Sequence, residues 1–383
     1  MELVASCLFG LEKFVAEDID ALGLRRIQTI DGRVVFEGRA EDIARCNINF
    51  RYAERVLIRL GAFAADSFDA LFEGTAALPW EDFIGRNDAF PVKGRSVKSA
   101  LYSIPDCQRI VKKAIAGRLS AKYGLERLPE TGVKYQIVFF ILNDEAWLMI
   151  DTSGEGLHKR GYRTQANEAP IRETLAAAMV RMARPRENVI LVDPFCGSGT
   201  IPIEAALLTS NTAPGINRGF ASELFPAVPA VSWKAAREEA LDSAVPSPVR
   251  IYGSDIDPSC LALCEANARR AGVENSVSFG ICDAGRFVSP ETDARGTIVT
   301  NPPYGERLGD LEESRRTAGR FGAALRSAVP SWQIYVISSD EEYEKYFGRR
   351  ADKVRRLYNG MIRCSYYQFF KKWQIINMRG INS

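Results

Sequence analysis

Residues Asn301-Pro302-Pro303-Tyr304 form a short pattern that could receive a planar base with an exocyclic amine. The two prolines prevent further strand pairing and hold the backbone in an extended turn. That turn brings together the Asn301 amide, a carbonyl at Pro302 and the aromatic face of Tyr304. An ordinary structural turn has little use for this combination. The pattern therefore predicts a catalytic cluster composed of Asn301, Pro302, Pro303 and Tyr304.

A glycine-rich loop after an acidic residue is the second functional pattern. Asp193 follows an apolar run, and Gly197 and Gly199 let the backbone turn sharply and approach a ligand closely. Pro202 stands where a dinucleotide-binding loop has its third glycine, and no P-loop lysine is present. The next strand-end acid, Asp255, lies 56 residues after Gly199 rather than about 20. These departures argue against NAD and nucleoside phosphates. The residues expected to bind the cofactor here are Asp193, Phe195, Cys196, Gly197, Ser198, Gly199 and Thr200.

Acidic residues at the ends of successive strands indicate which cofactor the loop accepts. S-Adenosylmethionine carries an ammonium and a sulfonium but no phosphate, and Asp193 can stabilise its methionine end electrostatically. Asp255 can accept hydrogen bonds from both ribose hydroxyls, and Asp283 is spaced to meet an adenine amine. The alternative is that Asp257 and Asp283 cap helices. The set predicts S-adenosylmethionine as cofactor and no metal.

Strands and helices alternate from Glu173 onward, which predicts an α/β fold with a mostly parallel, doubly wound sheet. A hairpin follows, with the favoured Asn359-Gly360 turn between 354–358 and 361–370. The stretch 210–248 is interpreted as an insertion. Expected strands are 189–192, 250–253, 277–281, 297–300 and 333–337, and expected helices are 173–183, 201–209, 258–271 and 312–328.

The N-terminal part divides into two smaller α+β units, so we expect domains at 1–65, 66–165 and 166–383, joined by a linker over 152–170. Between Lys93 and Lys134 the local charge is +7 in a chain of net +2, which indicates either a solvated helix face or an RNA-binding surface. A second basic run, also a candidate for RNA contact, includes Arg349, Arg350, Lys353, Arg355 and Arg356. The residues expected to contact RNA are Lys93, Arg95, Lys98, Arg109, Lys112, Lys113, Lys159 and Arg160.

The composition restricts the remaining possibilities. The chain has 383 residues, 46% of them hydrophobic, and 50 basic against 48 acidic side chains, which is too balanced for a general polyanion binder. Its 8 cysteines lack zinc-site spacing, and its single histidine, His158, is expected to be structural or near RNA rather than catalytic. We find no signal peptide and no apolar run long enough for a membrane helix, so we expect a cytoplasmic protein with reduced thiols.

These motifs resemble those of a known family. Residues 170–375 are similar to class I S-adenosylmethionine-dependent amino-methyltransferases, in both the loop and the Asn-Pro-Pro-Tyr cluster. Residues 66–165 resemble a THUMP RNA-binding domain, preceded by the small ferredoxin-like domain that accompanies it. Leu157–Arg163 and Ala169–Leu175 match the linker and the helix that precede this catalytic domain. The resemblance implies a Rossmann-like catalytic domain and adds Thr174 and Ile256 to the expected cofactor contacts.

Over nearly the whole chain the likeness is to RlmL-type ribosomal RNA guanine-N2 methyltransferases. It implies that the Asn301 oxygen and the Pro302 carbonyl accept the two amine N–H bonds while Tyr304 stacks on an extruded base. Some members carry a second methyltransferase domain for which this sequence has no room, so the modified nucleotide stays open.

Three alternatives remain. A DNA adenine-N6 methyltransferase uses the same cluster, but only 79 residues follow Tyr304, too few for a target-recognition region. A tRNA guanine-N2 enzyme shares both domain types. A non-catalytic RNA-binding assembly factor is disfavoured by the intact motif residues Asp193, Gly197, Asp255 and Asn301.

Overall fold

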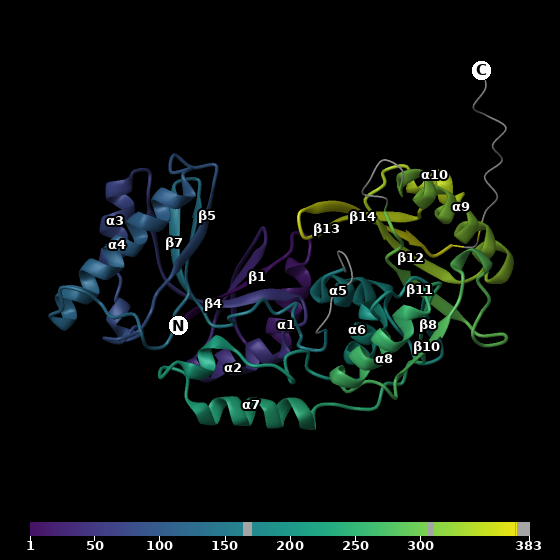
Figure 1. The fold of residues 1–383 in the computed structure, drawn as a ribbon, viewed down its shortest axis with the longest axis horizontal. Helices are drawn as coiled ribbons and strands as arrows, with labels where there is room; N and C mark the ends of the chain where they lie inside the picture. The colour runs from purple at the N-terminus through teal and green to yellow at the C-terminus, as the bar shows by residue number, and fades with distance from the viewer. Residues whose placement is uncertain (164–170, 305–309, 372, 374–383) are drawn as a thin grey trace, which may run out of the picture. The chain divides into compact units, whose positions relative to one another are not determined.

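The computed structural model of the chain describes residues 1–163, 171–304, 310–371 and Trp373 (Figure 1). The end of the expected linker, 164–170, lies outside the described residues. Contacts divide the chain into two compact units, each containing one seven-stranded sheet. The first unit comprises Met1–Cys7, Glu12–Leu157 and Arg218–Ala240, and the second comprises Leu8–Leu11, His158–Asn217 and Leu241–Ser383.

The sheet of the first unit has the strand order β2-β3-β1-β4-β7-β6-β5. All neighbouring strands are antiparallel except β5 and β6. Strand β4 pairs with β1 on one side and β7 on the other, so a single sheet continues across residue 65. The strands are β1 (Glu2–Cys7), β2 (Arg26–Ile30), β3 (Arg33–Glu37), β4 (Ala53–Ala64), β5 (Val92–Val97), β6 (Ile137–Leu142) and β7 (Glu145–Asp151).

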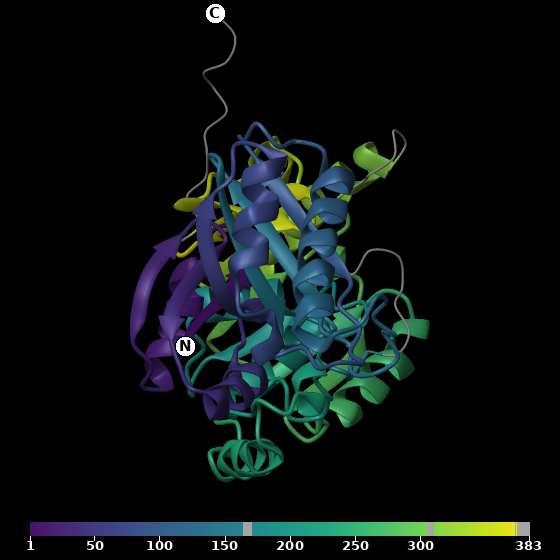
Figure 2. The ribbon, with the colours of Figure 1, turned by 90° about the vertical axis from the view of Figure 1, so that its left-hand side faces the viewer.

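Helices pack against this sheet. Helix α4 has a proline in its first turn and ends at Gly124, whose left-handed φ of 62° suits a helix C-cap. Helices α3 and α4 lie side by side near β5 (Figure 2). The helices of the unit are α1 (Glu12–Ala21), α2 (Ala40–Asn49), α3 (Phe68–Ala77), η1 (Trp80–Asp82), α4 (Ile104–Tyr123), η2 (Ala221–Leu224) and α7 (Ala230–Asp242), which runs two residues past the unit.

The sheet of the second unit has the order β10-β9-β8-β11-β12-β14-β13. Its strands are parallel up to β12, and β14 then runs antiparallel to both of its neighbours. The strand order reverses between β8 and β11, where α/β sheets of this kind bind ligands. The strands are β8 (Ile190–Asp193), β9 (Ile251–Asp255), β10 (Val277–Ile281), β11 (Gly296–Thr300), β12 (Gln333–Ser338), β13 (Lys353–Asn359) and β14 (Ile362–Phe369).

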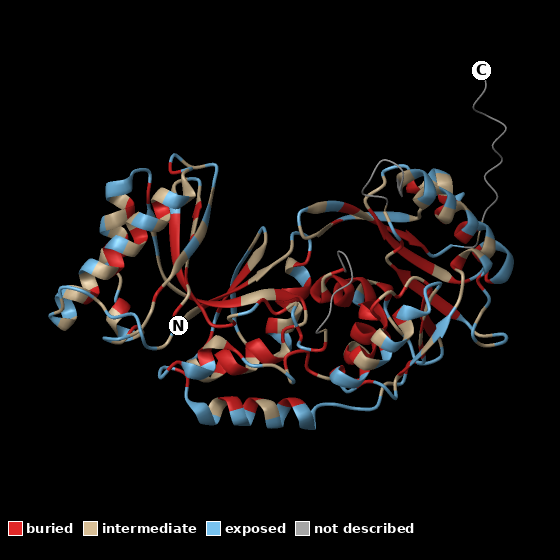
Figure 3. Ribbon diagram, in the orientation of Figure 1, coloured by how far each residue is buried: buried red, intermediate tan, exposed pale blue. Residues whose placement is uncertain are grey.

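Helices cover this second sheet, and its central strands are buried (Figure 3). Ile298, Ile334 and Val336 pack with Phe321 and Leu325 of α9 in one core cluster. Helices α5 and α6 pack against each other, and almost every residue of α5 is buried. The helices are α5 (Glu173–Ala183), α6 (Thr200–Thr209), α8 (Ser259–Ala271), η3 (Ala284–Arg286), α9 (Asp310–Ala328) and α10 (Tyr343–Phe347).

The predicted α/β architecture is confirmed, with every expected catalytic-domain strand lying within two residues of its observed bounds. Several elements were not predicted, among them β1, β2, β4, β5, α3, α7 and α10. Strand β5 is an edge strand in which small and charged residues alternate. The stretch 210–248, which was interpreted as an insertion, contains α7. The domain bounds at 65 and 165 stay a prediction.

Candidate active site

The loop between β8 and α6 folds onto the end of β9. The backbone N–H of Cys196 donates to the Ser254 carbonyl at 2.9 Å, and the N–H of Gly197 donates to Asp255 Oδ2 at 2.9 Å. Gly197 and Gly199 have φ of 51° and 82°. A Cβ at Gly199 would lie 3.2 Å from the Phe279 ring, whereas a Cβ at Gly197 would meet nothing within 4 Å. Close packing against Phe279 therefore leaves no room for a side chain at Gly199. Gly197 instead borders open space that a ligand can enter.

Asp193 ends β8 and is almost completely buried, with 1% of its surface exposed. Its Oδ1 accepts hydrogen bonds from the Phe195 N–H at 3.1 Å and from the Thr300 hydroxyl at 2.6 Å. Burial raises the pKa of Asp193 to about 7, although the Thr300 bond opposes this rise. Because no lysine or arginine of the described chain contributes to that pKa, a bound cation would be the group that favours the ionised carboxylate.

Asp255 and Ile256 lie where β9 ends. Asp255 accepts hydrogen bonds on both oxygens, from Gly197 N–H at 2.9 Å and Asp257 N–H at 3.1 Å. Ile256 is 62% exposed, and Ile281, at the end of the neighbouring β10, is 57% exposed. Exposed isoleucines at this sheet edge can flank a flat apolar ring.

Asp257 and Asp283 act as local caps in this structure. Asp257 accepts hydrogen bonds from the N–H and hydroxyl of Ser259, both at 2.8 Å, at the start of α8. Asp283 Oδ1 accepts the N–H of Gly285 at 2.8 Å at the start of η3. The capping alternative therefore describes both residues, and an adenine contact by Asp283 stays a prediction.

The Asn301–Tyr304 turn follows β11 directly. The Tyr304 hydroxyl donates a hydrogen bond to Asn301 Oδ1, and the Ser314 hydroxyl donates to the Pro303 carbonyl at 2.6 Å, which ties the turn to α9. Pro302 is buried, whereas Asn301 and Tyr304 are partly exposed. The Asn301 oxygen is thus an accessible acceptor that already receives one O–H.

The two motifs meet because β8 and β11 are parallel neighbours whose carboxyl ends share one edge. Ile298 pairs with Val192, and two residues further along the Thr300 hydroxyl reaches Asp193. The carboxylates, the exposed apolar side chains and the absence of a phosphate-binding lysine fit S-adenosylmethionine. They do not fit a nucleoside phosphate.

A buried polar network joins the N-termini of α5 and α6. The Arg163 guanidinium pairs with Glu173 at 2.8 Å and donates to the Thr200 hydroxyl at 3.3 Å. Burial raises the pKa of Glu173, and the neighbouring arginine opposes this. Thr174, an expected cofactor contact, is fully buried beside this network. Sequence reasoning did not find Arg163 or Glu173 as part of the site, although both lie in the stretches that matched the family.

Arg160 does not lie where an RNA contact requires it. Its side chain is buried, with Nε 3.4 Å from Glu204 Oε1, which also accepts the Tyr162 hydroxyl at 3.1 Å. A buried arginine in this environment is structural. Lys159, its neighbour, is exposed.

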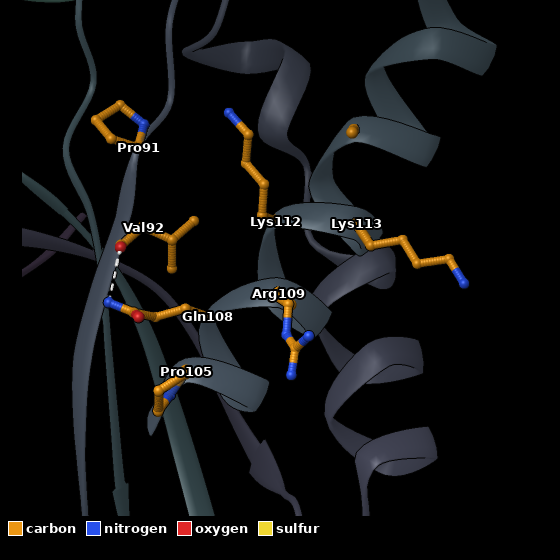
Figure 4. Close-up of a pocket in the computed structure, with 8 residues that line it drawn as sticks. Pro91, Val92, Pro105, Gln108, Arg109, Lys112 and Lys113 are labelled. Atoms are coloured by element: carbon orange, nitrogen blue, oxygen red, sulfur yellow. Dashed lines mark hydrogen bonds between the residues drawn. The ribbon is translucent and has the colours of Figure 1, made fainter. Parts of the chain in front are cut away.

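The remaining expected RNA contacts are on β5, the loop after it and α4. Lys93, Arg95, Lys98, Arg109 and Lys113 are exposed, while Lys112 is partly buried. Two are paired with acids: Arg109 with Asp106, and Lys112 with Glu130 at 2.6 Å. A hollow of about 840 Å³ lies here (Figure 4), lined by Pro91, Val92, Pro105, Gln108, Arg109, Lys112, Lys113 and Ala116.

The described part of the chain contains neither a candidate metal site nor a candidate membrane-spanning helix. No group of three or more histidine, cysteine, aspartate or glutamate side chains there could hold a metal ion. None of the helices in the described ranges is both long and apolar enough to span a membrane.

Three family models match successive parts of the chain. They are the RlmL ferredoxin-like domain at 2–57, the THUMP domain at 65–151 and the RMKL-like methyltransferase domain at 160–368. YpsC of Bacillus subtilis (strain 168), assigned as an RNA methyltransferase, is 42% identical over 97% of this chain and 96% of its own. The ribosomal RNA large subunit methyltransferase K/L of Syntrophotalea carbinolica is 33% identical over 94% of this chain, which spans about half (52%) of that relative.

Solved structures resemble the entire chain. A predicted N6-adenine-specific DNA methylase from Listeria monocytogenes is 45% identical with a TM-score of 0.89, covering 96% of each chain. SMU.472, assigned as a methyltransferase and solved with SAH, is 38% identical with a TM-score of 0.88, covering 97% of this chain and 98% of its own.

Proposed function

This chain belongs to the RMKL-like methyltransferase family, and on that basis we propose that it methylates N2 of a guanine in large-subunit ribosomal RNA. S-Adenosylmethionine is the methyl donor. The observation that carries the proposal is the 2.6 Å hydrogen bond from Thr300 to Asp193, because it holds the cofactor loop beside the Asn301 turn. Most of the rate acceleration would then come from positioning and from placement of charge.

The cofactor is held by groups at the carboxyl edge of the second sheet. Bound S-adenosylmethionine supplies a methyl group on a positively charged sulfur. Ionised Asp193 stabilises the cationic methionine end, Asp255 accepts the ribose hydroxyls and Ile256 packs on the adenine. The relative solved with SAH supports this use of the fold, since SAH is what remains after methyl transfer.

The Asn301 turn activates the target amine. An exocyclic amine is a weak nucleophile because its lone pair is delocalised into the ring. Asn301 Oδ1 and the Pro302 carbonyl accept its two N–H bonds, which favours a pyramidal nitrogen with its lone pair directed at the methyl group. The amine replaces the Tyr304 hydroxyl as donor to Asn301, and the released Tyr304 ring stacks on the base. After transfer the nitrogen loses one proton to water.

RNA is the favoured substrate because the matched THUMP domain carries exposed cations on β5 and α4. The relative from Syntrophotalea carbinolica, named for large-subunit ribosomal RNA, supports rRNA, and the likeness of the whole chain to RlmL-type enzymes supports guanine N2. We also propose three domains, 1–65, 66–165 and 166–383, and a cytoplasmic location.

Two other substrates are specific alternatives. The Listeria protein is described as a predicted N6-adenine-specific DNA methylase, and the Asn301 turn of this chain would serve adenine equally well. A tRNA guanine is the other. The site residues favour neither, and a non-catalytic assembly factor would not need them.

One experiment separates these functions. The protein is incubated with labelled S-adenosylmethionine and with rRNA, tRNA or DNA from cells that lack it, and the product nucleosides are identified. We expect N2-methylguanosine in large-subunit rRNA. Methyl groups only in DNA, only on adenine, or in no substrate would overturn the proposal.

A further inference from the structure

The β13–β14 hairpin extends past the sheet on the side where the active site lies. Strands β11 and β12 are parallel, and β14 is antiparallel to both β12 and β13, so β13 ends at the same edge as β11. The β12 ladder stops at the Ser338–Ser365 pair, while the hairpin continues to the Asn359–Ile362 pair. Three more residue pairs at about 3.3 Å per residue extend the hairpin roughly 10 Å beyond the edge.

The extension lies at the same edge of the sheet as the Asn301 turn. Three strand spacings of about 4.8 Å separate β11 from β13, or roughly 14 Å. Gly360, in the turn, has the Arg172 guanidinium 3.9 Å from the position of a Cβ. Arg172 immediately precedes the buried Glu173–Arg163 pair that reaches the cofactor loop. The tip therefore lies near the N-terminus of α5, whose first residue belongs to that network.

The exposed face of the hairpin carries charges and flat side chains. Arg356 and Arg363 are exposed, and no residue of the described chain forms an ion pair with either. Tyr358 is cross-strand to Arg363, is partly exposed and meets the Phe9 ring edge-on at 6.0 Å. Met361 at the tip is 88% exposed.

Two other basic residues nearby are less exposed than Arg356 and Arg363. Arg349 lies 3.6 Å from Asp352 and is 4% exposed, so it is committed to the fold. The Arg355 guanidinium contacts the Met182 sulfur at 3.7 Å on the other face of the hairpin. The exposed arginines of the hairpin, Arg356 and Arg363, thus share one face.

We infer that this hairpin binds the single-stranded RNA next to the target base, with Arg356 and Arg363 on phosphates and Tyr358 stacked on a base. Unpaired RNA matches the face because its bases can stack on aromatic rings while arginines neutralise its backbone. The inference rests on the proposed RNA substrate. It assigns to the catalytic domain a substrate surface of its own, in addition to the THUMP domain.

The test compares two doubly substituted full-length proteins. R356A/R363A removes two charges from the hairpin face. The control R269A/R326A removes two exposed arginines from the last turns of α8 and α9, which end at the opposite edge of the sheet. Binding of a fluorescein-labelled single-stranded RNA is followed by anisotropy at several salt concentrations. Cofactor affinity, measured by calorimetry, verifies that both variants are folded.

The hairpin variant should reduce the slope of log affinity against log salt by about 1.4, since each phosphate contact to a single strand contributes about 0.7. The control should keep the wild-type slope. Tyr358→Leu should weaken binding about 5- to 150-fold without changing the slope, and Tyr358→Phe should restore it. A hairpin variant with the wild-type slope, or a control that loses as much, would overturn the inference while leaving the proposed function intact. If the wild-type protein neither binds nor methylates RNA, the proposed function fails as well.

Discussion

Replacing Thr300 with valine tests the link between the two motifs. The substitution keeps the shape of the side chain but removes the hydroxyl that donates to Asp193 Oδ1. Both residues are buried, so water cannot replace the lost donor. The hydrogen bond from Thr300 stabilises the ionised form of Asp193. Its removal should therefore raise the pKa of Asp193 further above about 7.

The magnitude follows from the strength of that bond. A hydrogen bond to a charged group contributes about 1.5–3 kcal/mol, which corresponds to roughly a 10- to 100-fold change in an acid dissociation constant. Wild-type Asp193, with a pKa of about 7, is half ionised at neutral pH. In the variant the ionised fraction at pH 7, and with it the affinity for a cationic cofactor, should fall about 5- to 50-fold. At pH 9 the deficit should shrink to about twofold or less, because most of the carboxylate is ionised again.

Isothermal calorimetry with S-adenosylmethionine between pH 6 and 9 measures this effect. Thr297→Val is the matched control, since Thr297 is buried on the same strand and has no hydrogen bond to Asp193. We expect wild-type affinity to rise with pH through about 7, the Thr300→Val curve to be displaced to higher pH, and the control to follow wild type. An equal loss at every pH would mean that Thr300 acts through packing alone, and no loss would refute the role of ionised Asp193.

Three further predictions use other parts of the catalytic unit. Asn301→Ala should abolish methyl transfer while calorimetry finds nearly unchanged cofactor affinity; a large loss of affinity would contradict its assigned role. Gly253→Ala should lower the free energy of unfolding in urea by about 1–3 kcal/mol, because its Cβ would lie 2.8 Å from a neighbouring phenylalanine ring. Gly280→Ala, with nothing within 4 Å, should be nearly neutral and is the control. Arg160→Met should lower the free energy of unfolding by about 3–5 kcal/mol, because the buried Glu204 carboxylate loses its positively charged partner. Adding Glu204→Leu should recover much of this loss in the same assay, and an additive loss would exclude coupling.

Local sequence patterns predicted the catalytic unit well because its strands are short apolar runs separated by amphipathic helices. Helix α5 has the predicted bounds Glu173–Ala183, and the Asn359-Gly360 turn forms the predicted hairpin. Strand β4 was missed because its charged residues and Gly61 interrupt the alternation. Its pairing with β7 depends on a distant segment, which no local pattern reports.

For the site, sequence reasoning identified side chains by type but not by environment. Asp193 and Asn301 were expected near each other, and the parallel register of β8 and β11 explains their proximity. The Thr300 bond that joins them depends on three-dimensional contact and could not be predicted. Arg160 illustrates the same limit. It was expected to contact RNA because it lies in a basic stretch, but its side chain is buried against Glu204.

The central position of β4 has a consequence for how the protein is made. Leu57 of β4 pairs with Asp151 of β7, 94 residues later in the chain. At about 5–20 residues per second, a translating ribosome needs roughly 5–20 s to supply the second strand. During that interval β4 has β1 on one side and an open edge on the other, a template for pairing with the wrong chain. The nascent N-terminal segment therefore depends on timely synthesis of β7, and a premature stop within the THUMP region would release an aggregation-prone fragment.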